Sequence, residues 1–208
     1  MSTPRLIVLG STNRGKLREL EALLGRLPVE LRGLDAYPQA EPPEETGETF
    51  AENARLKAIG LAAQLGTWVM AEDSGLCVDA LGGRPGVRSA RFAGPEATDE
   101  DNVAKLLAEL EPVEPARRVA AFVCAAALAA PEGLLLETQG RCCGRIVRHP
   151  RGHNGFGYDP LFFYPDFGAT FAEVSAEAKN GVSHRGKAFR ALAERLPDLI
   201  GTRAKETG

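Results

Sequence analysis

The first residues that could do chemistry form a polar turn, Gly10 to Lys16, which reads GSTNRGK. An apolar run precedes the turn and a helical pattern follows it, so the turn nearly matches the phosphate-binding P-loop, G-x-x-x-x-G-K-[ST]. The match fails at Leu17, because a P-loop carries there a hydroxyl that ligates magnesium. The turn therefore leaves three interpretations open: a defective P-loop, a chance match, or another way of holding a triphosphate.

Carboxylates follow an apolar run in the stretch MAEDSGL, where Glu72 and Asp73 precede Ser74 and Gly75. We expect this run to be a strand that ends at the acidic pair. Serine and glycine favour turns, and active-site groups of α/β proteins often lie at strand ends. The stretch also resembles a Walker B strand, which keeps a P-loop enzyme open as an alternative. A solvated acidic turn is the remaining interpretation.

Acidic residues recur in PPEETGETF, where Glu44 and Glu45 precede a glycine and a helix that carries Lys57. Two carboxylate segments suit Mg²⁺-assisted phosphate hydrolysis, because hard oxygen ligands hold the ion and one carboxylate can orient or deprotonate a water. Taken alone, the segment is better interpreted as a solvated run of charge.

Two later stretches could recognise a nucleotide base. NGFGYDPLF places aromatic rings among glycines with an acceptor beside them, and AKNGVSHRGKAF crowds cations at the junction of two helices. Packing of the aromatics over a sheet and a basic surface helix are the alternatives. The residues concerned are Phe156, Gly157, Tyr158, Asp159, Lys179, His184 and Arg185.

Composition bounds the class of protein. The 208 residues are 44% hydrophobic and 25% charged with a net charge of -3, which argues against disorder, membrane spans and binding to nucleic acid polymers. The beginning of the chain lacks the pattern of a secretory signal, so we expect a cytoplasmic protein. The four cysteines show no C-x-x-C spacing and predict reduced thiols, and HPRGH is too irregular to present His149 and His153 as zinc ligands.

Hydrophobic periodicity predicts strands that alternate with helices, with a long hairpin late in the chain. This order favours one domain over residues 1–208, with a mixed α/β sheet and two lobes. The predicted strands are 5–9, 31–34, 67–71, 117–130, 134–147 and 169–174; the predicted helices are 14–27, 49–65 with a capping box at Thr49 and Glu52, 99–110, and two that begin near 175 and 186.

Five segments taken together are far more specific than any one of them. STNRGK, EETGETFAENARLKA, AEDSGLCVDALGGRPGVRSARFAG, FGYDP and SHRGKA closely resemble, in order and spacing, the inosine triphosphate pyrophosphatase family of non-canonical purine NTP pyrophosphatases. The resemblance covers nearly the whole chain. In this family the first turn reads Ser/Thr-x-Asn-x-x-Lys, so Gly10 and the missing hydroxyl at Leu17 are incidental. Glu72 departs from the family, which more often has Asp there.

The resemblance implies a fold and an activity. The fold is an elongated mixed β-sheet flanked by helices, with two lobes and an active-site cleft between them, in a protein that is usually a homodimer. The activity is the Mg²⁺-dependent hydrolysis of ITP, dITP and XTP to the nucleoside monophosphate and pyrophosphate, which cleanses the nucleotide pool. The partner is thus a small nucleoside triphosphate. A P-loop kinase or GTPase and a non-enzymatic nucleotide sensor are the rivals.

The resemblance also implies a role for each site residue. Asp73 activates the attacking water and holds Mg²⁺ together with Glu45. Ser74 touches the phosphate or the sugar. Phe156 stacks on the purine, with Gly157 and Tyr158 beside it, while the hydrogen bonds to the base come from Asp159, Lys179, His184 and Arg185. The triphosphate is bound by Ser11, Thr12, Asn13, Arg14, Gly15, Lys16 and Lys57.

Overall fold

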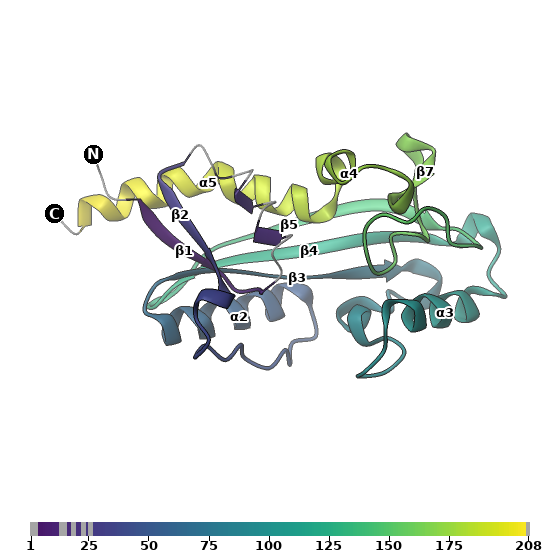
Figure 1. The fold of residues 1–208 in the computed structure, drawn as a ribbon, viewed down its shortest axis with the longest axis horizontal. Coiled ribbons are helices and arrows are strands. Elements are labelled where there is room, and N and C mark those ends of the chain that lie inside the picture. Colours follow the sequence, from purple (N-terminus) through teal and green to yellow (C-terminus); the bar gives the residue numbers. More distant parts are fainter. Residues whose placement is uncertain (1–3, 13–15, 18–19, 22–23, 25–26, 207–208) are drawn as a thin grey trace. The chain divides into compact units, whose positions relative to one another are not determined.

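The computed structural model describes residues 4–12, 16–17, 20–21, 24 and 27–206, and over 201–206 it describes the backbone alone. The predicted helix over 14–27 therefore lies partly outside the described residues. The site residues Asn13, Arg14 and Gly15 lie outside them as well. The strands are β1 Arg5–Leu9, β2 Val29–Gly33, β3 Trp68–Val78, β4 Val119–Ala130, β5 Gly133–Ile146, β6 Phe162–Tyr164 and β7 Ala169–Thr170. The helices are α2 Phe50–Leu65, α3 Asp99–Leu110, α4 Ala176–Val182 and α5 His184–Glu206 (Figure 1).

The strands form a seven-stranded sheet in the order β2-β1-β3-β4-β5-β6-β7. β1 runs parallel to β2 and β3, whereas β6 runs antiparallel to β5 and β7, so the predicted mixed sheet is confirmed. β4 and β5 are neighbours joined by only two residues, a connection that antiparallel strands alone can make, and the predicted hairpin is thereby confirmed.

Strand β4 is unusual in composition, because seven of its twelve residues are alanine. All of its residues except Val119 are buried. A strand covered on both faces loses the alternation of polar and apolar residues and reads as a continuous apolar run. The run therefore marks a central strand.

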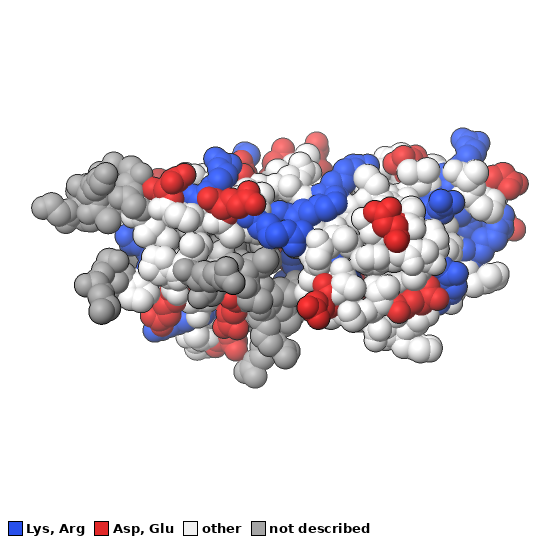
Figure 2. Space-filling model, turned by 90° about the horizontal axis from the view of Figure 1, so that it is seen from above, with Lys and Arg blue, Asp and Glu red and all other residues white. Residues whose placement is uncertain are grey.

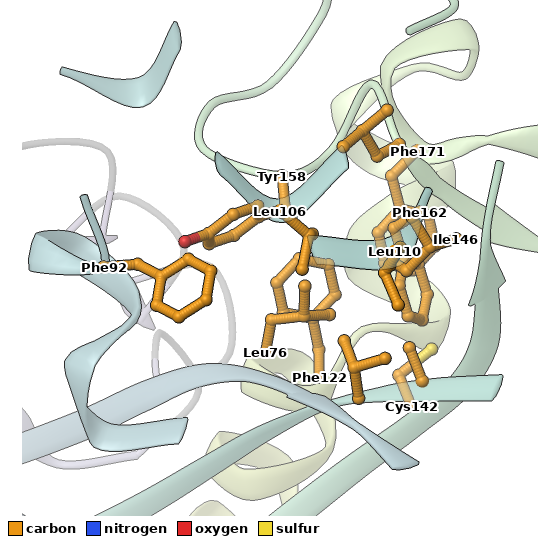
Figure 3. Packing of buried hydrophobic residues seen from close by; sticks show 13 residues of the cluster. Leu76, Phe92, Leu106, Leu110, Phe122, Cys142, Ile146, Tyr158, Phe162 and Phe171 are labelled. Carbon is orange, nitrogen blue, oxygen red and sulfur yellow. The ribbon is translucent and has the colours of Figure 1, made fainter. Parts of the chain in front are cut away.

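Contacts divide the chain into two compact units, and the cleft between lobes stays a prediction. The first unit comprises Met1–Asp73, Ala125–Gly140 and Gly186–Gly208, and the second comprises Ser74–Cys124 and Arg141–Arg185. In the first unit, α2 and α5 lie on opposite sides of the strands (Figure 1). The second unit has a core of aromatic and aliphatic side chains, among them Phe122, Phe162 and Phe171 (Figure 3).

The helix boundaries follow local signals. Thr49 and Glu52 form the predicted capping box of α2: the Glu52 amide donates to Thr49 Oγ1 (3.2 Å), and the Thr49 amide donates to Glu52 Oε2 (3.1 Å). Helix α2 ends at Leu65 and is capped by Gly66, whose φ of 64° favours glycine. Helix α3 spans the predicted 99–110. Its first turn carries a similar box between Thr98 and Asp101.

Two predictions about strands are wrong. Strand β3 does not end before Glu72 and Asp73 but continues to Val78, because Leu76 and Val78 are fully buried and extend the apolar pattern past Ser74 and Gly75. The predicted strand over 169–174 shortens to β7, since the Thr170 amide donates to Glu173 Oε2 (2.7 Å) and turns the next residues into a 3-10 helix. The 3-10 helices are Leu34–Ala36, Asp79–Leu81, Gly86–Arg91, Pro115–Arg117, Pro165–Phe167 and Phe171–Glu173.

The face shown in Figure 2 carries charges of both signs: Lys and Arg form a continuous patch near the middle of the view, and groups of Asp and Glu are scattered over the rest. Within the part of the chain that the structure describes, every helix is too short or too polar to cross a membrane. All four cysteines are free thiols, as predicted; Cys124 and Cys142 are buried, and Cys143 is exposed.

A buried arginine secures the end of α3. Arg118 is 2% exposed, and its guanidinium donates to the carbonyl oxygens of Leu110 (2.6 Å) and Val113 (3.0 Å). Burial lowers the pKa of Arg118 from its ordinary value. The cation meets the negative end of the helix dipole, where it binds the Leu110 carbonyl, which also accepts the Val113 amide (2.9 Å), and the Val113 carbonyl just beyond the helix.

We expect Arg118→Met to lower the free energy of unfolding by about 2–3 kcal/mol, because two hydrogen bonds from a charged group are lost at the end of α3. Urea denaturation measures the change. Arg117→Met is the control, because Arg117 is exposed; an equal, small effect of both substitutions would contradict the capping role of Arg118.

Candidate active site

Asp73 lies on β3 at the boundary of the first unit and is held by a neighbour from α2. The Nδ2 atom of Asn53 donates to Asp73 Oδ2 (3.0 Å), and the Asn53 side chain is completely buried. Asp73 itself is half-buried, so solvent reaches it. Asn53 therefore orients the Asp73 carboxylate, although the sequence motifs do not assign Asn53 to the site.

Two further carboxylates of the first unit are paired with the predicted cations. Lys57 Nζ lies 3.0 Å from Glu45 Oε1, and Lys16 Nζ lies 2.7 Å from Glu72 Oε1. The Glu72 side chain is only 1% exposed, so its charge is compensated at close range by that of Lys16. Successive residues of a strand face opposite sides, and Glu72 therefore points away from the side that Asp73 faces.

The described part of the first turn lies at the end of β1. The Ser11 amide donates to the Leu9 carbonyl (2.7 Å), the Ser11 carbonyl accepts from Leu34 (3.2 Å), and Thr12 is exposed. Gly10 has a packing role in addition: a Cβ atom there would lie 2.9 Å from Leu61 Cδ1. The glycine is thus needed for the close approach of β1 to α2, whatever the turn binds.

The donor set of the first unit fits Mg²⁺. Asp73 and Glu45 offer hard carboxylate oxygens, and Asp73 is pre-oriented by an amide. The described residues contain no group of three or more Asp, Glu, His or Cys that could hold a metal together. Mg²⁺ typically uses one or two carboxylates plus waters and substrate phosphates, so a larger protein cage is not required.

The second unit contains a pocket of about 140 Å³. Phe156 is the most exposed large apolar side chain among the described residues, at 56%. Lys179 Nζ and Arg185 Cζ lie 4.8 Å and 5.7 Å from the centre of its ring. Cations beside an aromatic face, in a concave and mostly apolar site, are typical of a place where a flat polar ligand stacks.

Asp159 organises this pocket. Its Oδ2 atom accepts the Phe156 amide (3.0 Å) and pairs with Lys179 Nζ, and both Asp159 and Lys179 are buried. The Gly157 amide donates to Asp99 Oδ2 (2.7 Å), which ties the same loop to the start of α3. The aromatic loop is therefore fixed at both of its central amides.

Tyr158 lines the pocket, but its hydroxyl is already used within the protein. The phenol is buried in the core of the second unit (Figure 3), and its Oη atom donates to the Ser89 carbonyl (2.8 Å). Burial raises the pKa of Tyr158 well above its ordinary value, helped by the charge of Asp99. The hydroxyl therefore stays protonated and structural.

Two remaining predicted residues close the pocket. Arg185 Nη2 lies 3.4 Å from Ser74 Oγ, and the His184 ring stacks on Phe122 with 4.8 Å between centroids. Sequence reasoning missed Ser89, Asp99 and Phe122. Phe122 sits in an apolar run that gives no sign of a site, whereas the position of Asp99 at a helix start could have suggested exposure near a loop.

The predicted residues thus fall into two groups. The first unit holds Ser11, Thr12, Lys16, Glu45, Lys57 and Asp73; the second holds Ser74, Phe156, Gly157, Tyr158, Asp159, Lys179, His184 and Arg185. Asp73 and Ser74, consecutive residues of β3, join the two groups. A cationic, carboxylate-bearing site on one unit and an aromatic pocket on the other are features of an α/β protein that binds nucleotides.

Comparison with known proteins makes the assignment specific. The Ham1 family model matches residues 7–195, and the chain belongs to this family. The dITP/XTP pyrophosphatase of Geobacter sulfurreducens is 50% identical over 190 residues, 91% of this chain and 96% of that protein. The corresponding protein of Bacillus cereus is 47% identical over 200 residues, 95% and 98% of the two chains. A HAM1 protein structure from Coxiella burnetii superposes with a TM-score of 0.88 at 41% identity, covering 93% and 99%.

Proposed function

We propose that this protein is a nucleoside triphosphate pyrophosphatase that hydrolyses ITP, dITP and XTP to the monophosphate and pyrophosphate. The observation that carries the proposal is the exposed Phe156 ring with Lys179 and Arg185 beside it, a stacking face whose donors suit an oxygen-bearing purine. The names of its relatives, dITP/XTP pyrophosphatase, support the same substrate class.

In this proposal the first unit binds the phosphates. Lys16, Lys57 and the turn at Ser11 and Thr12 attract the triphosphate, and Asn13, Arg14 and Gly15 of the same turn complete its binding. Asp73 accepts a proton from the water that attacks the α-phosphorus, the α–β anhydride bond breaks, and pyrophosphate leaves. Bound Mg²⁺, held by Asp73 and Glu45, would offset the negative charge of the phosphates.

The second unit binds the nucleoside. Phe156 stacks on the purine, and Ser74 contacts the phosphate or sugar. Lys179, His184 and Arg185 supply donors to the base oxygen, and Asp159 holds Lys179 and the loop in place. The requirement for Mg²⁺ in particular, a homodimer and a cytoplasmic location belong to the same proposal.

Product analysis separates this proposal from its rivals. A P-loop kinase or GTPase would release or transfer the terminal phosphoryl group, so orthophosphate or a phosphorylated acceptor would form in place of pyrophosphate. Leu17 argues against that class, because leucine offers no metal ligand. A nucleotide sensor would bind ITP in equilibrium dialysis with Mg²⁺ but release no pyrophosphate.

Base selectivity is the sharpest expectation. Hypoxanthine and xanthine carry an acceptor oxygen at purine position 6, where adenine carries an amino donor. A buried donor that faces this amino group leaves both groups without an acceptor, at a cost of roughly 1–3 kcal/mol per unpaired group. We therefore expect ITP and XTP to be hydrolysed much faster than ATP. A panel of triphosphates with Mg²⁺, read by pyrophosphate release, measures the order.

Arg185→Ala should lower the ratio of the ITP hydrolysis rate to the ATP hydrolysis rate. The change should come chiefly from slower hydrolysis of ITP, because the hypoxanthine base loses a hydrogen-bond donor. Arg32→Ala is the control, since Arg32 pairs with Glu30 on the surface of the first unit. If Arg185→Ala preferred ITP over ATP as strongly as the unaltered protein does, groups other than Arg185 would be responsible for recognising the base.

A further inference from the structure

The segment that carries Glu45 is held along one face of α2 by four successive contacts. Glu41 exchanges two backbone-to-side-chain hydrogen bonds with Gln64: the Glu41 amide donates to Oε1 (3.1 Å) and Nε2 donates to the Glu41 carbonyl (2.8 Å). Pro43 packs against Gly60, where a Cβ atom would overlap the Pro43 ring. Glu45 pairs with Lys57, and the Gly47 amide donates to Asn53 Oδ1 (2.8 Å).

These contacts follow a regular pattern. On the segment they fall at every second residue, 41, 43, 45 and 47, as in an extended chain. On α2 they fall at 64, 60, 57 and 53, spacings of four, three and four that form one stripe of a helix. The extended segment therefore runs antiparallel to α2, and each contact fixes its position along the helix.

Asn53 is the contact that joins this segment to Asp73. Its carboxamide uses both ends: Oδ1 accepts from Gly47, and Nδ2 donates to Asp73 Oδ2 (3.0 Å). Only one orientation of the amide satisfies an N–H donor on one side and a carboxylate acceptor on the other. Because the side chain is completely buried, water cannot replace either bond without a rearrangement.

We propose that Asn53 is a positioning residue for hydrolysis, one that sets Asp73 and the Glu45-bearing segment at a fixed distance from each other. This inference rests on the proposed function, because it matters for turnover only if Asp73 and Glu45 act on the substrate. An amide suits the role better than a carboxylate or an ammonium group, since it bridges a donor and an acceptor without adding charge beside Asp73.

The main test is Asn53→Leu, which keeps the side-chain size and removes both hydrogen bonds. We expect kcat for ITP to fall by about 10- to 100-fold, because a misplaced catalytic group costs rate steeply. In the same variant, measured without metal or substrate, the backbone amide hydrogens of residues 44–48 should exchange with deuterium faster than in the unaltered protein. That second reading is independent of activity.

A second variant tests the same segment independently, so that the proposal can still be tested if Asn53→Leu does not fold. Gly60→Ala should not weaken α2, because alanine favours helix more than glycine, but its methyl group meets Pro43 and lifts the segment. We expect a lower kcat and faster exchange of residues 44–48. The double substitution Pro43→Ala/Gly60→Ala removes the overlap and should restore both readings toward the values of the unaltered protein.

Gln64→Ala is the matched control, because it frees the segment only at Glu41, far along α2 from Asn53. Its kcat should stay within about twofold of the unaltered protein. An equal loss in Gln64→Ala, or unchanged kcat and exchange in both Asn53→Leu and Gly60→Ala, would overturn the positioning role. Absence of pyrophosphate release from the unaltered protein would instead contradict the proposed function, while the exchange experiment would still test the contacts themselves.

Discussion

Asp73→Asn is expected to lower kcat for ITP by about 10² or more, because the substitution removes both a base and an anionic metal ligand. The amide keeps the size of the side chain and can still contact Asn53, so the fold should be retained. Steady-state kinetics with saturating Mg²⁺ and ITP measure the loss.

Asp79→Asn makes the same chemical change at an exposed residue beyond the end of β3 and serves as the control. Its kcat should equal that of the unaltered protein. Near-normal turnover in Asp73→Asn would remove Asp73 from the chemistry and require another base.

Asp159→Ala should destabilise the protein more than Arg118→Met does, lowering the free energy of unfolding by about 3–5 kcal/mol. It leaves the buried Lys179 ammonium group without its carboxylate and the Phe156 amide without its acceptor. Urea denaturation followed by circular dichroism measures the change. Asp159→Leu/Lys179→Met removes both charges and should recover much of the loss, because the pair also costs desolvation.

Glu137→Ala provides the comparison with a surface pair. Arg55 holds Glu137 through two hydrogen bonds of 2.9 Å, yet both side chains are solvent-accessible, and such pairs contribute about 1 kcal/mol or less. If Asp159→Ala cost no more than Glu137→Ala, the pair with Lys179 would be solvated and the pocket more open than its contacts indicate.

Sequence reasoning succeeded where local signals decide the structure. The capping box at Thr49 and Glu52 determines where α2 begins, and the apolar runs on either side of PEG, residues 131–133, predict the β4–β5 hairpin. It failed at β3, because Ser74 and Gly75 favour a turn locally while the burial of Leu76 and Val78 keeps the strand extended. Tertiary packing decides such cases over residue preference.

The candidate site was predictable in its residue types but not in its connections. The lysines and carboxylates stand out in the sequence, whereas the pairing of Lys16 with Glu72 and of Lys57 with Glu45 depends on how strands and helices pack. Asn53 gave no signal of its own, since an asparagine on a helix is commonly a surface residue. Its two hydrogen bonds exist only because β3 and the segment before α2 meet at that point.

The alanine-rich strand β4 has a consequence for how this sequence can vary. A core of leucine or isoleucine tolerates a smaller residue at the expense of a cavity, but alanine has only a methyl group to lose. Almost every substitution at the seven alanines of β4 therefore adds volume, and added volume in a packed interior displaces the neighbours on the face to which that side chain points. Variation at these positions should be confined to glycine, serine and cysteine, so the least conspicuous side chains of the protein are among its least exchangeable.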